Sequence, residues 1–345
     1  MRPWADCRSL DAWTSNASRA PVRFAEGRSG RRSASAMVFV LLACASAGAA
    51  SHGLRESTGL TRSLAWTFEP WEICSLFLSA VVYGVGIGRL WHRAGIGHGV
   101  RLGQAVAYFS GLLAIVVALV SPLDSLGEAL FSAHMVEHEL LMIVAAPLLV
   151  LGRPLAAWVW AIPERGRQAI GAFFRRPGWR RPWRLFTGPL CAWTLHALAL
   201  WVWHVPALFQ AALESEAVHA LQHLCFLGTA LLFWWSLLGG TSRRDRAIAL
   251  LSVFTTMVHT GALGALLTLS TVVWYPIYAV STPVWGLTPL QDQQLGGIIM
   301  WVPSGLVYIV FGLVLSHRWL FGSAAHRPLA APLSRPGPPP DQAPA

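Results

Sequence analysis

Residues 132–152 of the chain read SAHMVEHELLMIVAAPLLVLG, and this stretch decides the fold class. Most of it is an apolar run of the roughly 20 residues that an α-helix needs to cross a hydrocarbon core of about 30 Å. Six other stretches share this character. We therefore predict an all-α, polytopic bundle with seven transmembrane helices, over residues 71–90, 104–120, 133–151, 185–203, 217–238, 248–269 and 295–317.

The composition of the 345 residues supports a membrane protein. Hydrophobic residues make up 54% of the chain and charged residues only 12%, a balance outside that of water-soluble domains. The long apolar runs do not alternate as barrel strands do, and backbone amides in lipid must bond within their own segment, which favours helices. The five cysteines form no C-x-x-C pair and no Walker A motif is present, which excludes thioredoxin-like, zinc-ribbon and P-loop proteins.

The basic residues predict the orientation of the bundle. All 26 are arginine, and among the connections between spans only the first, third and fifth contain them, while the second, fourth and sixth carry none. Because cytoplasmic loops are enriched in basic residues, we expect the C-terminus in the cytoplasm and the N-terminus of the first span outside. The expected location is a bacterial plasma (inner) membrane.

Three regions follow from composition. Residues 1–50 form a signal-like or poorly ordered segment, in which arginines precede an apolar stretch, 37–50, that is too short to span a bilayer. Residues 66–320 form the seven-helix domain. Residues 321–345 are rich in proline and alanine and are expected to be a disordered cytoplasmic tail.

The long third connection carries eight arginines, with Trp179 and Trp183 between them. A basic stretch of this kind is compatible with nucleic-acid binding. A cytoplasmic segment beside the membrane that binds anionic lipid headgroups, with tryptophans at the interface, explains it better. We therefore expect anionic lipid, and no nucleic acid, as a partner of this loop.

Five of the twelve histidines lie at one depth, at the ends of spans predicted to face outside. His134 and His138 begin the third span, His219 and His223 begin the fifth, and His204 ends the fourth. The i,i+4 spacing of both pairs places two imidazoles on one face of each helix. Two such helices facing each other could supply four nitrogens to one metal ion, and imidazole suits copper, zinc, iron and nickel alike.

Other residues are expected to assist this site. Met135 offers a thioether that favours Cu(I), and Gln222 could orient an imidazole. His259, like His196, lies deeper in its span, as part of an inward path or as a satisfied core residue. Negative charge that attracts a cation comes from Glu137, Glu139, Asp124 and Glu128.

Two further interpretations remain open. Residues 134–138, HMVEH, match the inverted zincin motif H-x-x-E-H, in which two histidines bind zinc and the glutamate, here Glu137, acts as general base. The chain would then be a membrane zinc metalloprotease. Paired histidines on two helices could also bind a b-type haem in a membrane redox protein, although i,i+4 pairs at one depth suit a single ion better.

Several motifs occur together along the chain. They are SAHMVEH at 132–138, AAPLL at 145–149, the group His219, Gln222, His223 and Phe226, the pair Met257 and His259, DQQLGG at 292–297 and MWVP at 300–303. This combination resembles the seven-helix CtaG family of cytochrome c oxidase assembly factors, named for the caa3-type oxidase. The resemblance covers about residues 66–319, and Glu137 stands where this family commonly has glutamine.

The resemblance implies a non-enzymatic maturation factor embedded in the membrane. It would act with the catalytic subunit of cytochrome c oxidase or with other assembly factors. Copper is the expected cofactor, inserted into that subunit through the histidine cluster. The expected ligands are His134, His138, His219 and His223, with His204 auxiliary.

Overall fold

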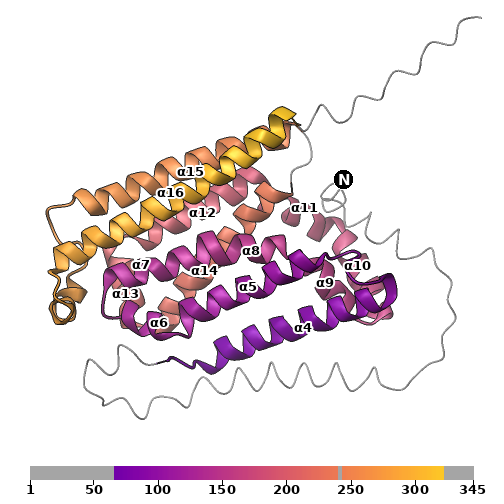
Figure 1. Cartoon of the computed structure of the whole chain (residues 1–345), viewed down its shortest axis with the longest axis horizontal. Helices are drawn as coiled ribbons and strands as arrows, with labels where there is room; N and C mark the ends of the chain where they lie inside the picture. The colour runs from indigo at the N-terminus through magenta and orange to yellow at the C-terminus, as the bar shows by residue number, and fades with distance from the viewer. Residues whose placement is uncertain (1–65, 240–242, 322–345) are drawn as a thin grey trace, which may run out of the picture.

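The computed structural model describes residues 66–239 and 243–321, and every regular element within these ranges is helical (Figure 1). The signal-like segment 1–50 and the tail after residue 321 lie outside the described residues. Six helical segments are long and apolar enough to cross a membrane, as in a multi-pass membrane protein. They are α4 (Pro70–Ala94), α5 (Leu102–Leu119), Phe131–Leu151, α14 (Glu216–Leu238), α15 (Arg243–Leu269) and α16 (Pro289–Phe321).

The third span, Phe131–Leu151, is not a uniform α-helix. It consists of α7 (Phe131–Glu139), a π-helical stretch η2 (Leu140–Ala145) and α8 (Ala146–Leu151). A π-helical turn inside an α-helix is uncommon and is often found beside functional sites. Here it follows directly after the turn that carries His134 and His138.

The fourth span differs from the segment expected at residues 185–203. The structure has α11 (Pro177–Phe186) and α12 (Pro189–Trp203), which meet at a bend of 60°. Pro189 has no N–H to continue the preceding helix, and its fixed φ favours the first position of a new one. Because α12 alone has 15 residues, or roughly 22 Å at 1.5 Å per residue, a seventh span requires both helices.

Short helices close the two ends of the bundle. At the end where α7 and α14 begin lie α6 (Pro122–Gly127), α13 (Pro206–Glu214) and the 3-10 turns η3 (Pro276–Ala279) and η4 (Thr282–Trp285), and we call this the histidine end. At the other end, the arginine end, lie α9 (Pro154–Ala161), α10 (Glu164–Arg175) and α11.

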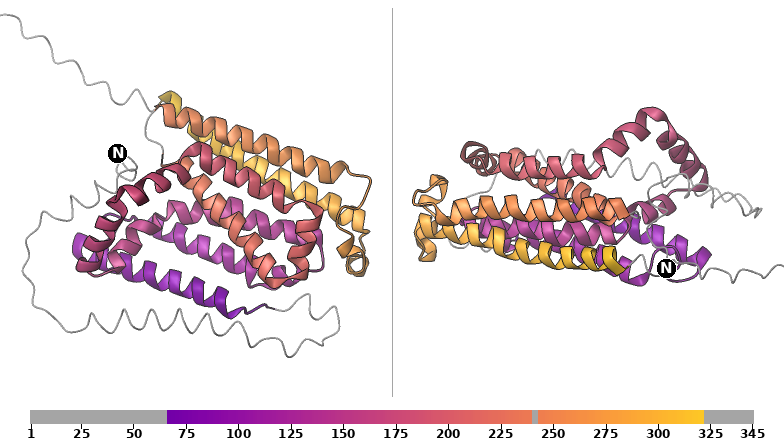
Figure 2. Two further views of the ribbon diagram at one scale, coloured as in Figure 1. Left: turned by 180° about the vertical axis from the view of Figure 1, so that it is seen from behind. Right: turned by 90° about the horizontal axis from the view of Figure 1, so that it is seen from above.

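Buried side chains form two clusters that share the third span. One cluster lies among α7, α12, α14, α15 and α16, and includes Phe131, Phe226 and Trp234. The other lies among α4, α5, α8 and α9, and includes Tyr83 and Tyr108. Figure 2 shows the corresponding arrangement, with α15 and α16 along one side of the bundle and α4 along the other. The third span is therefore central, and so are the histidines at its beginning.

Candidate metal centre

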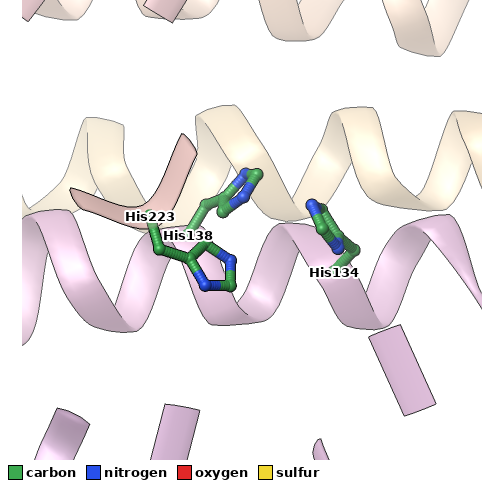
Figure 3. Close-up of side chains that lie close together, drawn as sticks. All are labelled: His134, His138 and His223. Atoms are coloured by element: carbon green, nitrogen blue, oxygen red, sulfur yellow. The ribbon is translucent and has the colours of Figure 1, made fainter. Parts of the chain in front are cut away.

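The structure brings the two histidine pairs together. His134 and His138 lie on α7, and their rings face those of His219 and His223 on α14 (Figure 3 shows three of them). The ring centroid of His134 lies 5.3 Å from that of His219 and 5.9 Å from that of His223. The ring centroid of His138 lies 5.4 Å from that of His223. The i,i+4 spacing places each pair on one face of its helix, and the packing of α14 against η2 and α8, which continue α7, brings the two faces together.

Two overlapping groups of atoms are close enough to bind one ion. One ring nitrogen from each of His134, His138 and His223 lies within 4.8 Å of the others. In a second group, one ligand atom from each of His134, Glu137 and His219 also lies within 4.8 Å of the others. His134 belongs to both, so this residue is at the centre of the cluster.

Burial without hydrogen bonding is the most informative property of these imidazoles. His134 and His138 are each 1% exposed and His223 is 6% exposed. Within the described residues, both nitrogens of His134 and His138 and Nε2 of His219 and of His223 have no hydrogen-bond partner. Each buried unpaired polar group costs about 1–3 kcal/mol, so such a concentration indicates a site built for a ligand.

His204, at the end of α12, is a suitable auxiliary ligand. Its Nδ1 lies 2.7 Å from the carbonyl oxygen of Leu200, and because a carbonyl only accepts, Nδ1 carries the proton. Nε2 is then the atom with the lone pair, and it is buried without a hydrogen-bond partner among the described residues. Burial lowers the pKa of His204 to about 4, which keeps the ring neutral. Its ring centroid is 6.2 Å from that of His138.

Glu137 lies inside the same cluster. Its side chain is fully buried, and Oε2 is 3.7 Å from Nδ1 of His134 and 3.7 Å from Nε2 of His223. On the other side, the carboxylate abuts Gly127 of α6, where an added Cβ would lie only 2.0 Å from Oε1. The absence of a side chain at Gly127 is therefore what allows Glu137 to fit beneath α6.

The other expected helpers have different positions. Gln222 is fully buried and its side chain is within reach of His134. Met135 packs toward α16, where a Cβ at Gly296 would lie 3.3 Å from its Cγ. His259 lies beside Trp193 of α12, with the ring centroids 6.0 Å apart, and close enough to His196 to interact with it electrostatically.

Asp292 is a site residue that the sequence motifs did not assign to the site. It is fully buried at the start of α16, and its carboxylate accepts hydrogen bonds from the backbone N–H groups of Phe131 at 2.7 Å and Ser132 at 3.1 Å. These N–H groups belong to the first turn of α7 and have no acceptor within the helix itself. A negative charge at this position is also favoured by the helix dipole. A charged residue in an apolar span is the signal that could have identified it.

An aromatic layer covers the cluster at the histidine end. Phe209 of α13 packs against the ring of His134 at 5.0 Å and against Tyr275 at 4.4 Å. Tyr275 donates a hydrogen bond to the carbonyl oxygen of His204, and Tyr278 donates one to that of Gly127. Burial raises the pKa of Tyr278, so its hydroxyl remains a donor. These contacts tie the connection between α15 and α16 to the site.

Comparison with known proteins identifies the family. The sequence model described as "cytochrome c oxidase caa3 assembly factor" matches residues 81–321. The chain belongs to this family. The resemblance to CtaG proteins drawn from its motifs is thus confirmed, and the histidine cluster lies in the matched region.

The relatives add no assigned activity. The chain is 27% identical to an uncharacterized protein of Mycobacterium bovis over 267 residues, which cover 74% of this chain and 39% of that protein. An uncharacterized protein of Mycobacterium leprae is 26% identical over 73% of this chain and 40% of its own length. The chain therefore spans about two fifths of the length of these curated relatives. No solved structure matches it.

The donor set fits a metal ion. Imidazole nitrogens are common ligands of copper and zinc, and neutral buried rings with available lone pairs need not be deprotonated before binding. Beside a bound cation, the carboxylate of Glu137 would supply one negative charge. His134, His138, His219 and His223 would hold the ion, with His204 close by.

Proposed function

We propose that this CtaG-family protein assists copper insertion into the catalytic subunit of a cytochrome c oxidase, as a carrier rather than an enzyme. The observation that supports the proposal is the group of convergent, buried imidazoles without hydrogen-bond partners. They lie near one end of the bundle, from which an ion has a short path to a neighbouring membrane protein. The family supplies the oxidase as the client.

The charge of the site favours Cu(I) over a divalent ion. A buried charge is costly unless it is paired, and among the described residues Glu137 is the carboxylate in contact with the imidazoles. Cu(I) with one carboxylate is neutral, whereas Zn²⁺ would leave a net positive charge. Histidine ligands without thiolates also hold copper loosely enough for a transfer step, since a carrier must release its cargo.

The geometry argues against the two other interpretations of the histidines. The general base of a zinc protease must reach a water molecule beside a peptide substrate, and Glu137 is fully buried. In a haem protein the imidazoles would face a macrocycle. Here the rings of His134 and His138 meet edge to face, with centroids 4.3 Å apart, and they pack against Phe209 and Phe226 at 5.0 and 4.5 Å.

The experiment compares the copper content of the detergent-purified protein, after Cu(I) loading, with that of His134→Ala, His138→Ala. We expect about one copper per chain at this cluster and its loss in the variant, with lower oxidase activity in cells that carry it. His92→Ala is the matched control, because His92 is exposed at the arginine end. A variant that keeps its copper, or full oxidase activity in its presence, would refute the carrier.

We also infer that the histidine end faces the outside of a bacterial plasma membrane. The support is the distribution of arginines, which are absent from the connections at this end. A fluorescent protein fused after residue 321 should fold and fluoresce, as a cytoplasmic fusion does. A dark but stable fusion would reverse the orientation.

We infer further that α10 and α11 bind the anionic lipid surface. Every described side chain of α11 is exposed. Trp179, Trp183 and Phe186 recur at i, i+4 and i+7 on one face, and Arg181 and Arg184 occupy the other. A helix with this pattern is stable at a membrane interface, with its aromatic face in the acyl region and arginines at the headgroups. Anionic lipid retained through purification is the corresponding measurement.

A further inference from the structure

A short acidic helix lies directly over the buried carboxylate of Glu137. Asp124 is within α6 and Glu128 is its C-terminal cap, on either side of Gly127. Gly127 is the residue against which the carboxylate of Glu137 rests. Two more carboxylates are thus carried by the helix that rests on Glu137, close enough to interact with it electrostatically.

The three carboxylates differ in exposure in a regular order. Glu128 is exposed, Asp124 is half-buried and Glu137 is fully buried. Both oxygens of Glu137 lack hydrogen-bond partners within the described residues. One of them faces α6, and the other is 3.7 Å from both His134 and His223. Glu137 therefore joins the acidic helix to the imidazoles.

Negative charges on neighbouring carboxylates repel one another. Asp124, Glu128 and Glu72 of α4 all interact unfavourably with Glu137, and burial strengthens this effect because less water screens the charges. A cation that passes among them removes the repulsion. The same negative potential raises the local concentration of cations at the entrance.

We propose that Glu128, Asp124 and Glu137 form the entry path by which a copper ion reaches the histidine cluster, with Glu137 passing it to the imidazoles. This inference rests on the proposed function. Carboxylate oxygens bind copper more weakly than imidazole nitrogens do, so affinity increases along the path and the ion moves inward. The exposed carboxylate of Glu128 and then the half-buried one of Asp124 replace its hydration shell step by step.

The test measures the rate of copper loading separately from the amount bound. Purified protein in nanodiscs takes up Cu(I) from a weak chelator whose colour reports its release. The variant Asp124→Asn, Glu128→Gln keeps the shape of both side chains and all the imidazoles. We expect its initial rate to fall about tenfold, within the range for electrostatic steering, while its final copper content equals that of the wild type.

The matched control is Glu164→Gln, which removes an exposed carboxylate at the arginine end and should load at the wild-type rate. Raising the salt concentration should slow the wild type toward the double variant, since screening weakens steering. A double variant that loads as fast as the wild type overturns the entry path and leaves the carrier intact. A wild type that takes up no copper refutes the carrier itself.

Discussion

The two ends of the bundle use polar residues in opposite ways. At the histidine end they are buried, as His134, His138 and Asp292 show, and short helices fold over them. At the arginine end they are exposed, and α11 lies outside the packed core. Burial makes the geometry of polar groups costly to disturb, whereas exposure makes each residue nearly independent of its neighbours.

This difference indicates where specific chemistry can occur. A buried group without a partner is tolerated only where a ligand or a neighbouring contact compensates for it, so the histidine end is suited to binding an ion. The arginine end is suited to an extended surface such as lipid headgroups. Substitutions at the two ends should therefore differ in both size and kind of effect.

The largest effect is expected at Asp292. Asp292→Ala leaves the buried N–H groups of Phe131 and Ser132 without acceptors and removes a negative charge from the beginning of α7. We expect a loss of about 3 kcal/mol in the free energy of unfolding, because charge-assisted hydrogen bonds are each worth about 1.5–3 kcal/mol. Copper binding should weaken as well, since α7 carries two of the histidines.

Unfolding of the detergent-solubilised protein by heat or by increasing SDS gives the measurement. Gln291→Ala is the control for Asp292→Ala, because Gln291 is exposed in the same turn of α16 and bonds only within its own turn. If the two variants unfold alike, the carboxylate does not anchor α7.

A smaller loss is expected at Gly127. In Gly127→Ala the new Cβ would lie 2.0 Å from Oε1 of Glu137, so either α6 or the carboxylate must move. Overpacking of this kind costs about 1–3 kcal/mol. The same displacement would separate Glu137 from His134 and His223 and lower the affinity for copper.

The matched control is Gly84→Ala in α4, where an added Cβ has no atom within 4 Å. That change should be neutral or stabilise the helix by up to about 1 kcal/mol, because alanine favours a helix more than glycine does. Equal copper affinity in Gly127→Ala and Gly84→Ala would show that the contact between α6 and Glu137 has no part in binding.

The sequence predicted the helices well where a long apolar run is the whole signal. It misplaced the fourth span because Leu185 and Phe186 extend the apolar run, although Pro189 begins a new helix. Helix geometry alone predicts that Met135 points away from the imidazoles, because consecutive residues on a helix point about 100° apart and Met135 follows His134 directly. The number of spans and the orientation remain predictions.

The histidine pairs could be predicted to share a face, but not to meet. Spacing fixes the direction of side chains on one helix, whereas the approach of α7 and α14 depends on packing across the bundle. Contacts such as those of Tyr278 with Gly127, 151 residues apart in sequence, have no local signal at all. Asp292 is intermediate, since its burial could be suspected and its partners could not.

The smallest effect on folding is expected at the arginine end. Trp179 and Trp183 are 50% and 41% exposed, so replacing both with alanine should change the free energy of unfolding in detergent by less than about 0.5 kcal/mol each. Copper binding should be unchanged. What should fall is the anionic lipid that remains bound, because the aromatic face of α11 no longer enters the bilayer.

Native mass spectrometry of protein released from anionic nanodiscs measures that lipid directly. Trp201→Ala is the control, since Trp201 is 39% exposed on α12, toward the histidine end, away from the arginine-rich helices. Equal lipid retention in the control and the double variant would mean that α11 does not insert. If instead oxidase subunits failed to co-purify with the double variant, α11 would be a protein-docking helix, and both ends of the bundle would then contact the client.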